Sequence, residues 1–175
     1  MAGFGGQGIL LLGKILAYAG MLEDREVTWF PSYGGEMRGG TANCAVIISD
    51  ELIASPIVTN PDILIVMNDA SLQKFQPQLK QKGILIFDSS LIKSPALRND
   101  VEILRVPATE ISSTIGYTKS ANMVLTGALI AKTRILEETT VFEALDNSIT
   151  RGKKSIEMNK MAIREGMRFF EDKKG

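Results

Sequence analysis

The sequence GFGGQG at residues 3–8 decides how this chain is expected to fold, and the apolar run Ile9–Leu12 follows it directly. Because glycine adopts positive φ angles without strain at Cβ, four glycines in six residues predict a tightly turned backbone that another group can approach closely. A helix is expected to begin at about Gln7. The free N–H groups of its first turn would suit an anionic or polar group.

The same stretch satisfies the dinucleotide-binding pattern G-x-G-x-x-G. That pattern needs a strand before it and an acidic residue after the next strand. Only Met1 and Ala2 precede the glycines, so the first strand is expected to be missing, and the next predicted strand, Glu26–Phe30, ends without a carboxylate. A generic dinucleotide site is therefore disfavoured. A purely structural role for the glycines, in close packing of a helix on a strand, stays open.

The segment PSYGGEMRGG at residues 31–40 is a second candidate for contacts with a ligand or a partner. Its glycines and proline predict an irregular loop between two strands, and such loops on a rigid scaffold often carry binding residues. Arg38 suits a carboxylate or phosphate because its guanidinium donates in a planar fork. The alternative is a surface loop in which Glu36 and Arg38 form a solvated pair.

Composition excludes several classes of function. The 175 residues are enough for one domain with a substantial core, and Lys+Arg and Asp+Glu both number 20, so no net field attracts nucleic acid or an anionic membrane. No apolar run approaches the length of a membrane span. Cys44 is the single cysteine and histidine is absent, which leaves no ligand set for an iron–sulfur cluster or structural zinc. We expect a soluble, cytoplasmic protein whose Cys44 is a buried core side chain.

The remainder of the chain predicts an α/β fold. Apolar strands are expected at 41–49, 62–67, 84–88 and 101–106, with a short extended piece at 53–58 that pairs back on the first of them. The strand at 62–67, a helix to about Lys80 and the strand at 84–88 form a βαβ crossover, which requires parallel strands. Helices follow at 121–132, 137–149 and 155–170. The expected fold is a Rossmann-like three-layer α/β domain, residues 1–175, with a largely parallel sheet and a helical C-terminal segment.

Two motifs together resemble the gamma subunit of the 2-oxoacid:ferredoxin oxidoreductases: Gly-x-Gly-Gly-Gln-Gly at 3–8 and Pro-Ser-Tyr-Gly-x-Glu-Met-Arg-Gly-Gly at 31–40. The resemblance covers essentially the whole chain. Its further points are Ile48-Ser49-Asp50, Ser55-Pro56, Ala121-Asn122-Met123, Gly127-Ala128, and Asn159, Ala162 and Gly166. Pro-Ser-Tyr and Glu-Met-Arg look more like the 2-oxoglutarate branch than the pyruvate branch.

The resemblance implies a noncatalytic subunit of an oxidoreductase that decarboxylates a 2-oxoacid, with 2-oxoglutarate expected, to an acyl-CoA. It implies that thiamine diphosphate, magnesium and iron–sulfur clusters reside on partner alpha, beta and ferredoxin-like delta subunits, and that ferredoxin or flavodoxin takes the electrons. The isolated chain is expected to be inactive. A pyruvate or branched-chain 2-oxoacid enzyme, or a stand-alone nucleotide-binding module, remains as the alternative.

In this family the domain packs beside the thiamine site and helps to form the coenzyme A channel, so the resemblance places two segments of this chain there. The first segment contains Gly5, Gly6, Gln7 and Gly8. The second contains Ser32, Tyr33, Gly34, Glu36, Arg38 and Gly39.

Overall fold

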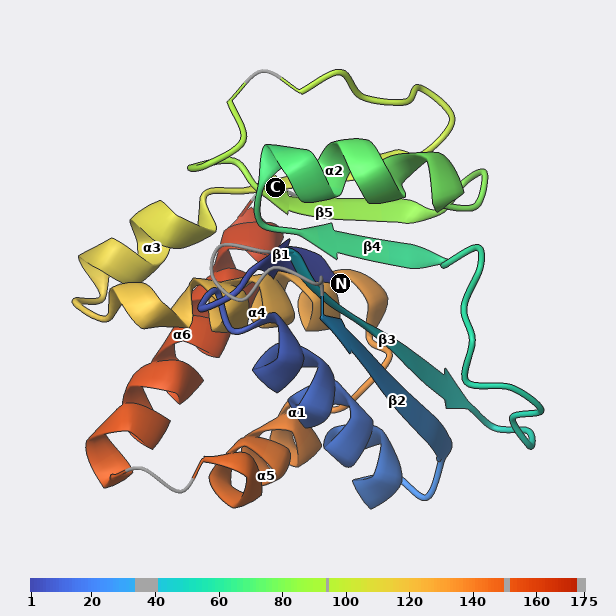
Figure 1. Cartoon of the computed structure of the whole chain (residues 1–175). Helices are drawn as coiled ribbons and strands as arrows, with labels where there is room; N and C mark the ends of the chain where they lie inside the picture. The colour runs from blue at the N-terminus through green and yellow to red at the C-terminus, as the bar shows by residue number, and fades with distance from the viewer. Residues whose placement is uncertain (34–40, 94, 150–151, 173–175) are drawn as a thin grey trace.

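The computed structural model describes residues 1–33, 41–93, 95–149 and 152–172. Six strands in these residues form one sheet in the order β2-β3-β1-β4-β5-β6 (Figure 1). The strands are β1 (Ala2–Phe4), β2 (Glu26–Tyr33), β3 (Thr41–Ser49), β4 (Ile63–Val66), β5 (Ile84–Asp88) and β6 (Glu102–Val106). The helices are α1 (Ile9–Leu22), α2 (Asp69–Phe75), α3 (Ala108–Thr114), α4 (Ala121–Thr133), α5 (Glu138–Ser148) and α6 (Lys153–Asp172), with short 3-10 turns η1 (Gln76–Gln78) and η2 (Thr118–Ser120).

Strand directions confirm the expected largely parallel sheet. Strands β1, β4, β5 and β6 pair with one another in parallel, in that order. Strand β3 is antiparallel to both of its neighbours, β1 and β2, so β2 runs in the same direction as β1. Within the described sheet, β3 is thus the one strand that runs the other way.

The expectation that the first strand would be missing is wrong, because the glycine stretch itself supplies it. Strand β1 pairs with both neighbours: Ala2 lies opposite Asn43 of β3 and opposite Val66 of β4. Gly3 makes this possible, since a Cβ at that position would lie 2.7 Å from Gln7 Oε1. A strand of three residues shows no alternation of apolar and polar side chains, so its pattern gave no signal.

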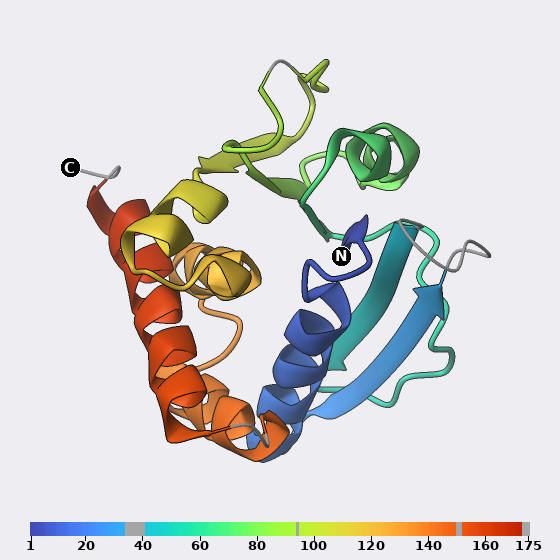
Figure 2. The same cartoon turned by 60° about the vertical axis from the view of Figure 1, so that its left-hand side comes forward.

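The sheet separates two layers of helices (Figure 2). On one face, α1 packs on β2 and β3 and α4 packs on β5, while α6 lies over α4 on the side away from the sheet. Helix α4 is buried nearly all round, as its apolar sequence predicts. On the other face, α2 packs on β1 and β4. The strands therefore stand between helical layers, as expected, and the C-terminal helices thicken one of them.

Several element boundaries differ from the sequence expectation. Helix α1 begins at Ile9, two residues later than expected, because Gly8 takes a left-handed backbone with φ of 76° at the N-cap. Strand β2 continues through Tyr33 instead of ending at Phe30, and its position at the sheet edge tolerates Pro31. Helix α2 gives way to η1 at Gln76, where Pro77 follows, and the segment 53–58 forms no strand.

None of the described helices combines the length and the apolar character that a membrane span needs.

Candidate functional site

The carboxyl ends of β1 and β4 define the candidate site. These strands are parallel neighbours, yet the helices that follow them lie on opposite faces of the sheet, α1 on one and α2 on the other (Figure 1). The apolar side chains of α1 join one core cluster, whereas Leu72 of α2 joins the other with Leu64 and Val66. In open α/β sheets, the point where successive helices diverge to opposite faces leaves a crevice in which ligands bind. The glycine loop, residues 5–8, lies at this point, and we call the region the switch crevice.

Gln7 ties the two sides of the switch crevice together. Its Oε1 accepts a hydrogen bond from the Phe4 N–H at 2.6 Å, and its Nε2 donates to the Met67 carbonyl at 3.1 Å. The Asn68 Nδ2 also donates to Gln7 Oε1 at 3.3 Å. One side chain thus joins the end of β1 to the end of β4. It fixes the loop after β1 relative to the start of α2.

Asn68 has a second role, because it caps α2. Its Oδ1 accepts from the Ser71 N–H at 2.8 Å, and its side chain is almost fully buried. The sequence alone did not predict the bond to Gln7. Such a contact joins residues 61 positions apart, so no local pattern reveals it.

Asn122 of α4 contacts the glycine loop and bonds to it. Its Nδ2 donates to the Gly8 carbonyl at 3.0 Å, while its Oδ1 is buried without a hydrogen-bond partner among the described residues. A Cβ on Gly8 would lie 2.4 Å from Asn122 Nδ2. Gly8 therefore meets two demands that exclude other residues, the left-handed backbone and the contact with Asn122. Gly8 thus has a structural role, but the contact is with helix α4 and not with a strand.

The other loop glycines differ from Gly8. Gly5 and Gly6 are exposed, and a Cβ on either would meet nothing within 4 Å. Gly6 has φ of 95°, a conformation that favours glycine. The N–H groups of Gly6 and Gly8 find no acceptor among the described residues, and no side chain caps α1. The loop therefore offers backbone donors to an outside group.

The second candidate segment reaches the same edge of the sheet. Strand β2 ends at Tyr33 and β3 begins at Thr41, and Thr41 lies opposite Phe4, directly before the glycine loop. Ser32 and Tyr33 belong to β2, which corrects the expectation that they form part of a loop. Their backbones lie at the edge that carries Gly5, Gly6, Gln7 and Gly8. Gly34, Glu36, Arg38 and Gly39 lie outside the described residues.

The described part of the switch crevice carries no ionisable side chain among the residues that form it: glycines, Gln7, Asn68 and Asn122. Such a set can donate and accept hydrogen bonds and hold a group in position, but it cannot transfer a proton as a general acid or base. Cys44 does not change this, since burial raises the pKa of its thiol and its Sγ donates to the Ile9 carbonyl at 3.5 Å. In the described ranges, no three potential ligands from His, Cys, Asp and Glu gather around a metal position.

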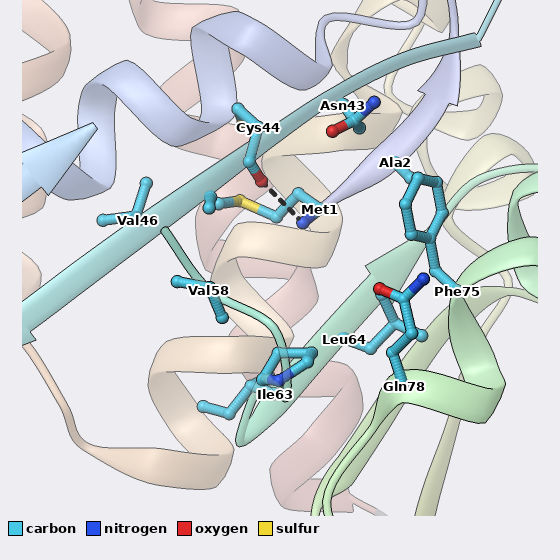
Figure 3. A pocket seen from close by; sticks show the side chains of 12 residues that line it. Met1, Ala2, Asn43, Cys44, Val46, Val58, Ile63, Leu64, Phe75 and Gln78 are labelled. Carbon is cyan, nitrogen blue, oxygen red and sulfur yellow. Dashed lines mark hydrogen bonds between the residues drawn. The ribbon is translucent and has the colours of Figure 1, made fainter. Parts of the chain in front are cut away.

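A small cavity of about 120 Å³ lies between β1, β3 and β4 on the α2 side (Figure 3). Mostly apolar groups line it, including Val58, Leu64 and Phe75, and the amino nitrogen of Met1 donates to the Cys44 carbonyl beside it at 2.9 Å. No convergent polar side chains point to a ligand there. The switch crevice therefore remains the candidate site.

Comparison with known proteins points to one family. Residues 1–169 match the family described as pyruvate ferredoxin/flavodoxin oxidoreductase. A ketoisovalerate oxidoreductase subunit VorA from Methanothermobacter thermautotrophicus is 38% identical over 95% of this chain, but the match covers only 35% of that relative. The 2-oxoglutarate synthase subunit KorC from Methanocaldococcus jannaschii is 36% identical over 95% of this chain and 89% of its own length. The chain therefore spans about a third of one relative and nearly all of the other.

Solved structures share the fold. The gamma subunit of a keto/oxoacid ferredoxin oxidoreductase from Geobacter sulfurreducens superposes with a TM-score of 0.83 and 26% identity, over 98% of this chain and 96% of that one. A 2-oxoglutarate:ferredoxin oxidoreductase from Magnetococcus marinus, solved with 2-oxoglutarate, coenzyme A and succinyl-CoA, gives a TM-score of 0.90. There the match covers 98% of this chain and 30% of that chain at 24% identity, so it supports the fold alone.

Proposed function

Because the chain belongs to the pyruvate ferredoxin/flavodoxin oxidoreductase family, we propose that it is the gamma subunit of a multisubunit 2-oxoacid:ferredoxin oxidoreductase. The observation that carries this proposal is the match to the KorC subunit, which covers nearly the whole of both chains. In this proposal residues 1–175 form one gamma-subunit domain in the cytoplasm. The partners are the alpha, beta and ferredoxin-like delta subunits.

The complex would oxidatively decarboxylate a 2-oxoacid to an acyl-CoA and pass the electrons to ferredoxin or flavodoxin. Thiamine diphosphate with magnesium, iron–sulfur clusters and coenzyme A would supply that chemistry on or with the partner subunits. This chain has one cysteine and no histidine, so it lacks the thiolates that a cluster needs and the commonest proton-transfer side chain. Its own contribution is to bind and to position.

The switch crevice suits that contribution. Gln7 holds the glycine loop against Met67 and Asn68, and the N–H groups of Gly6 and Gly8 are free to donate to a polar or anionic group. We propose that this loop, with the segment that follows Tyr33, lines the coenzyme A and thiamine region of the assembled enzyme. A fixed loop places its donors without a cost in ordering the backbone at the moment of binding.

A partly exposed apolar surface supports the role as a subunit. Helix α1 packs on one side of β2 and β3, where Gly13 approaches Cys44 and Trp29. Side chains alternate along a strand, so Thr28, Phe30, Ala45 and Ile47 lie on the other side, and we call this side the open face. The loop after β3 runs beside this side of the sheet (Figure 2), and Ala45 lines the small cavity together with Phe75 of α2. Phe30 is 49% exposed on the open face, and apolar surface left open in this way is typical of protein interfaces.

The substrate is proposed to be 2-oxoglutarate, since the KorC relatives match over nearly their whole length. A branched-chain 2-oxoacid is the second candidate, because the VorA relative is 38% identical. Activity of the complex with 2-oxoglutarate and with 2-oxoisovalerate, compared at equal concentration, separates the two. Higher kcat/KM for 2-oxoisovalerate would overturn the 2-oxoglutarate assignment.

The open face provides a test of assembly by mutation. Phe30→Asp should weaken association with the partner subunits by about 2 kcal/mol or more, roughly thirtyfold, because a desolvated aromatic anchor becomes a buried charge. Stability of the free chain should change little, since Phe30 is half exposed there. Association is measured by titration of labelled chain into the other subunits.

Met161→Asp is the matched control for Phe30→Asp. Met161 is 46% exposed, but it lies on α6, in the helical layer on the opposite side of the sheet. This variant should associate like the unmodified chain. If Phe30→Asp also associates normally, the open face is not the interface.

A further inference from the structure

A second cleft, of about 570 Å³, lies at the opposite end of the strands from the switch crevice. It opens beside Ile63 and Ile84, the first residues of β4 and β5, and the C-terminal end of α4 forms another wall. We call it the amino-end cleft. Its volume is in the range of cavities that hold small molecules. Nothing in the proposed gamma-subunit function uses it.

The amino-end cleft is rich in positive charge. Arg25, Lys80, Lys82 and Arg134 line it, against a single acid, Asp62. Lys80 already neutralises Asp62 at 2.7 Å, and Arg25 is held by Asp50 at 2.9 Å. Lys82 and Arg134 have no ion-pair partner among the described residues. The cleft therefore presents two unpaired cations, and a bound anion would neutralise them.

The backbones of these two residues are also unusual. Lys82 has φ of 59° and Arg134 has φ of 51°, a left-handed region that strains every side chain with a Cβ. Glycine would relieve that strain, and it is the preferred residue where a helix ends in this conformation, as α4 does at Arg134. In the described residues, Asp24 is the one other non-glycine residue with positive φ, and it does not line the cleft. Two positions in one cleft thus carry a lysine and an arginine although glycine would be less strained there. This points to a function for their positive charges.

The uncharged lining of the cleft is mixed: Gln81 and Thr133 are polar, and three isoleucines are apolar. Ile63, Ile84 and Ile135 contribute side chains next to the cations. A cleft that is lined by both unpaired cations and isoleucines suits a molecule that carries both a phosphate and an apolar or planar body.

We propose that the amino-end cleft binds a phosphate monoester of a small organic molecule, with the phosphate held by Lys82 and Arg134 and its body against the isoleucines. The site is separate from the switch crevice, because it lies at the other end of β4. Its existence does not depend on the proposed oxidoreductase role. The phosphate ligand should bind the free chain.

Adenosine monophosphate serves as the probe, with adenosine and inorganic phosphate as comparisons, in calorimetric titrations of the full chain. Adenosine monophosphate should bind saturably, at least tenfold more tightly than adenosine. Lys82→Gly and Arg134→Gly should each weaken its binding at least tenfold while the midpoint of thermal unfolding stays equal or rises, since each removes a charge and relieves strain. Arg134→Lys, which keeps the charge, should retain most of the affinity.

Asp24→Gly is the matched control, because it relieves the same kind of strain outside the cleft. It should leave the affinity for adenosine monophosphate unchanged. Three results would overturn the proposal: no saturable binding of adenosine monophosphate at millimolar concentration, equal binding of adenosine, or unchanged affinity in both Lys82→Gly and Arg134→Gly. Inorganic phosphate should bind more weakly than adenosine monophosphate, and equal affinity would contradict the contact with the isoleucines.

Discussion

Gly127→Ala should lower the free energy of unfolding by more than about 3 kcal/mol, the largest stability effect that the fold implies. A Cβ on Gly127 would lie 1.9 Å from the carbonyl oxygen of Ile163 in α6, so the backbones of α4 and α6 are in direct contact. The contact is reciprocal, since a Cβ on Gly166 would lie 2.0 Å from the carbonyl oxygen of Val124. No rotamer change relieves a clash with backbone, so the two helices must separate and lose core contacts. That loss exceeds the gain of about 1 kcal/mol that alanine brings to a helix.

Denaturant titration of the full chain measures this effect. Gly5→Ala is the control, because a Cβ there meets nothing within 4 Å, and its unfolding free energy should change by less than about 0.5 kcal/mol. Gly166→Ala should behave like Gly127→Ala. A loss below about 1 kcal/mol in both helix variants would mean that α4 and α6 do not pack as closely as described.

Gln7→Leu should reduce the activity of the assembled enzyme by about 100-fold, because misplacing a positioning loop by a small distance costs rate on that scale. The leucine removes the bonds to Phe4, Met67 and Asn68 together. The glycine loop then loses its link to β4. Gln7 is a positioning residue in this account, so the KM for coenzyme A should rise as well as kcat fall. Unfolding free energy should fall by about 2 kcal/mol, at about 1 kcal/mol for each main hydrogen bond.

Two variants sharpen the Gln7 test. Gln7→Glu keeps the acceptor for the Phe4 N–H but loses the donor to the Met67 carbonyl, so its activity should fall between those of Gln7→Leu and the unmodified enzyme. Gln73→Leu is the matched control, since Gln73 is exposed on α2 and its side chain makes no hydrogen bond to another described residue. Activity of Gln7→Leu equal to that of Gln73→Leu would show that the switch crevice does not need the hydrogen bonds of Gln7.

The sequence predicts those parts of the fold that rest on local pattern. Strands β4 and β5 are visible because their continuous apolar runs are buried on both faces, and α4 because it is apolar nearly all round. Strand β1 was not predicted because three residues, one of them glycine, show no periodic pattern of apolar side chains. The extension of β2 through Pro31 and Tyr33 was not predicted, because proline and tyrosine at these positions are equally compatible with a turn.

The same distinction between local pattern and long-range contact applies to the candidate sites. The glycine loop is visible as composition, but its support by Asn122 joins residues 114 positions apart and needs the fold to appear. The resemblance named the Ala121-Asn122-Met123 motif without indicating this contact. Neither the positive φ of Lys82 and Arg134 nor their meeting in one cleft has a sequence signal, because ordinary lysine and arginine positions look the same.

The measurement that tests the central claim most directly is reconstitution of the enzyme with and without this chain. The alpha, beta and delta subunits would be supplied with thiamine diphosphate, magnesium, coenzyme A and 2-oxoglutarate, and reduction of a viologen dye followed. The account predicts that the chain alone gives no reduction, that the other subunits without it give little, and that the full set restores 2-oxoacid-dependent reduction in proportion to chain bound. Full activity of the other subunits without this chain, or its failure to associate with them, would contradict the account.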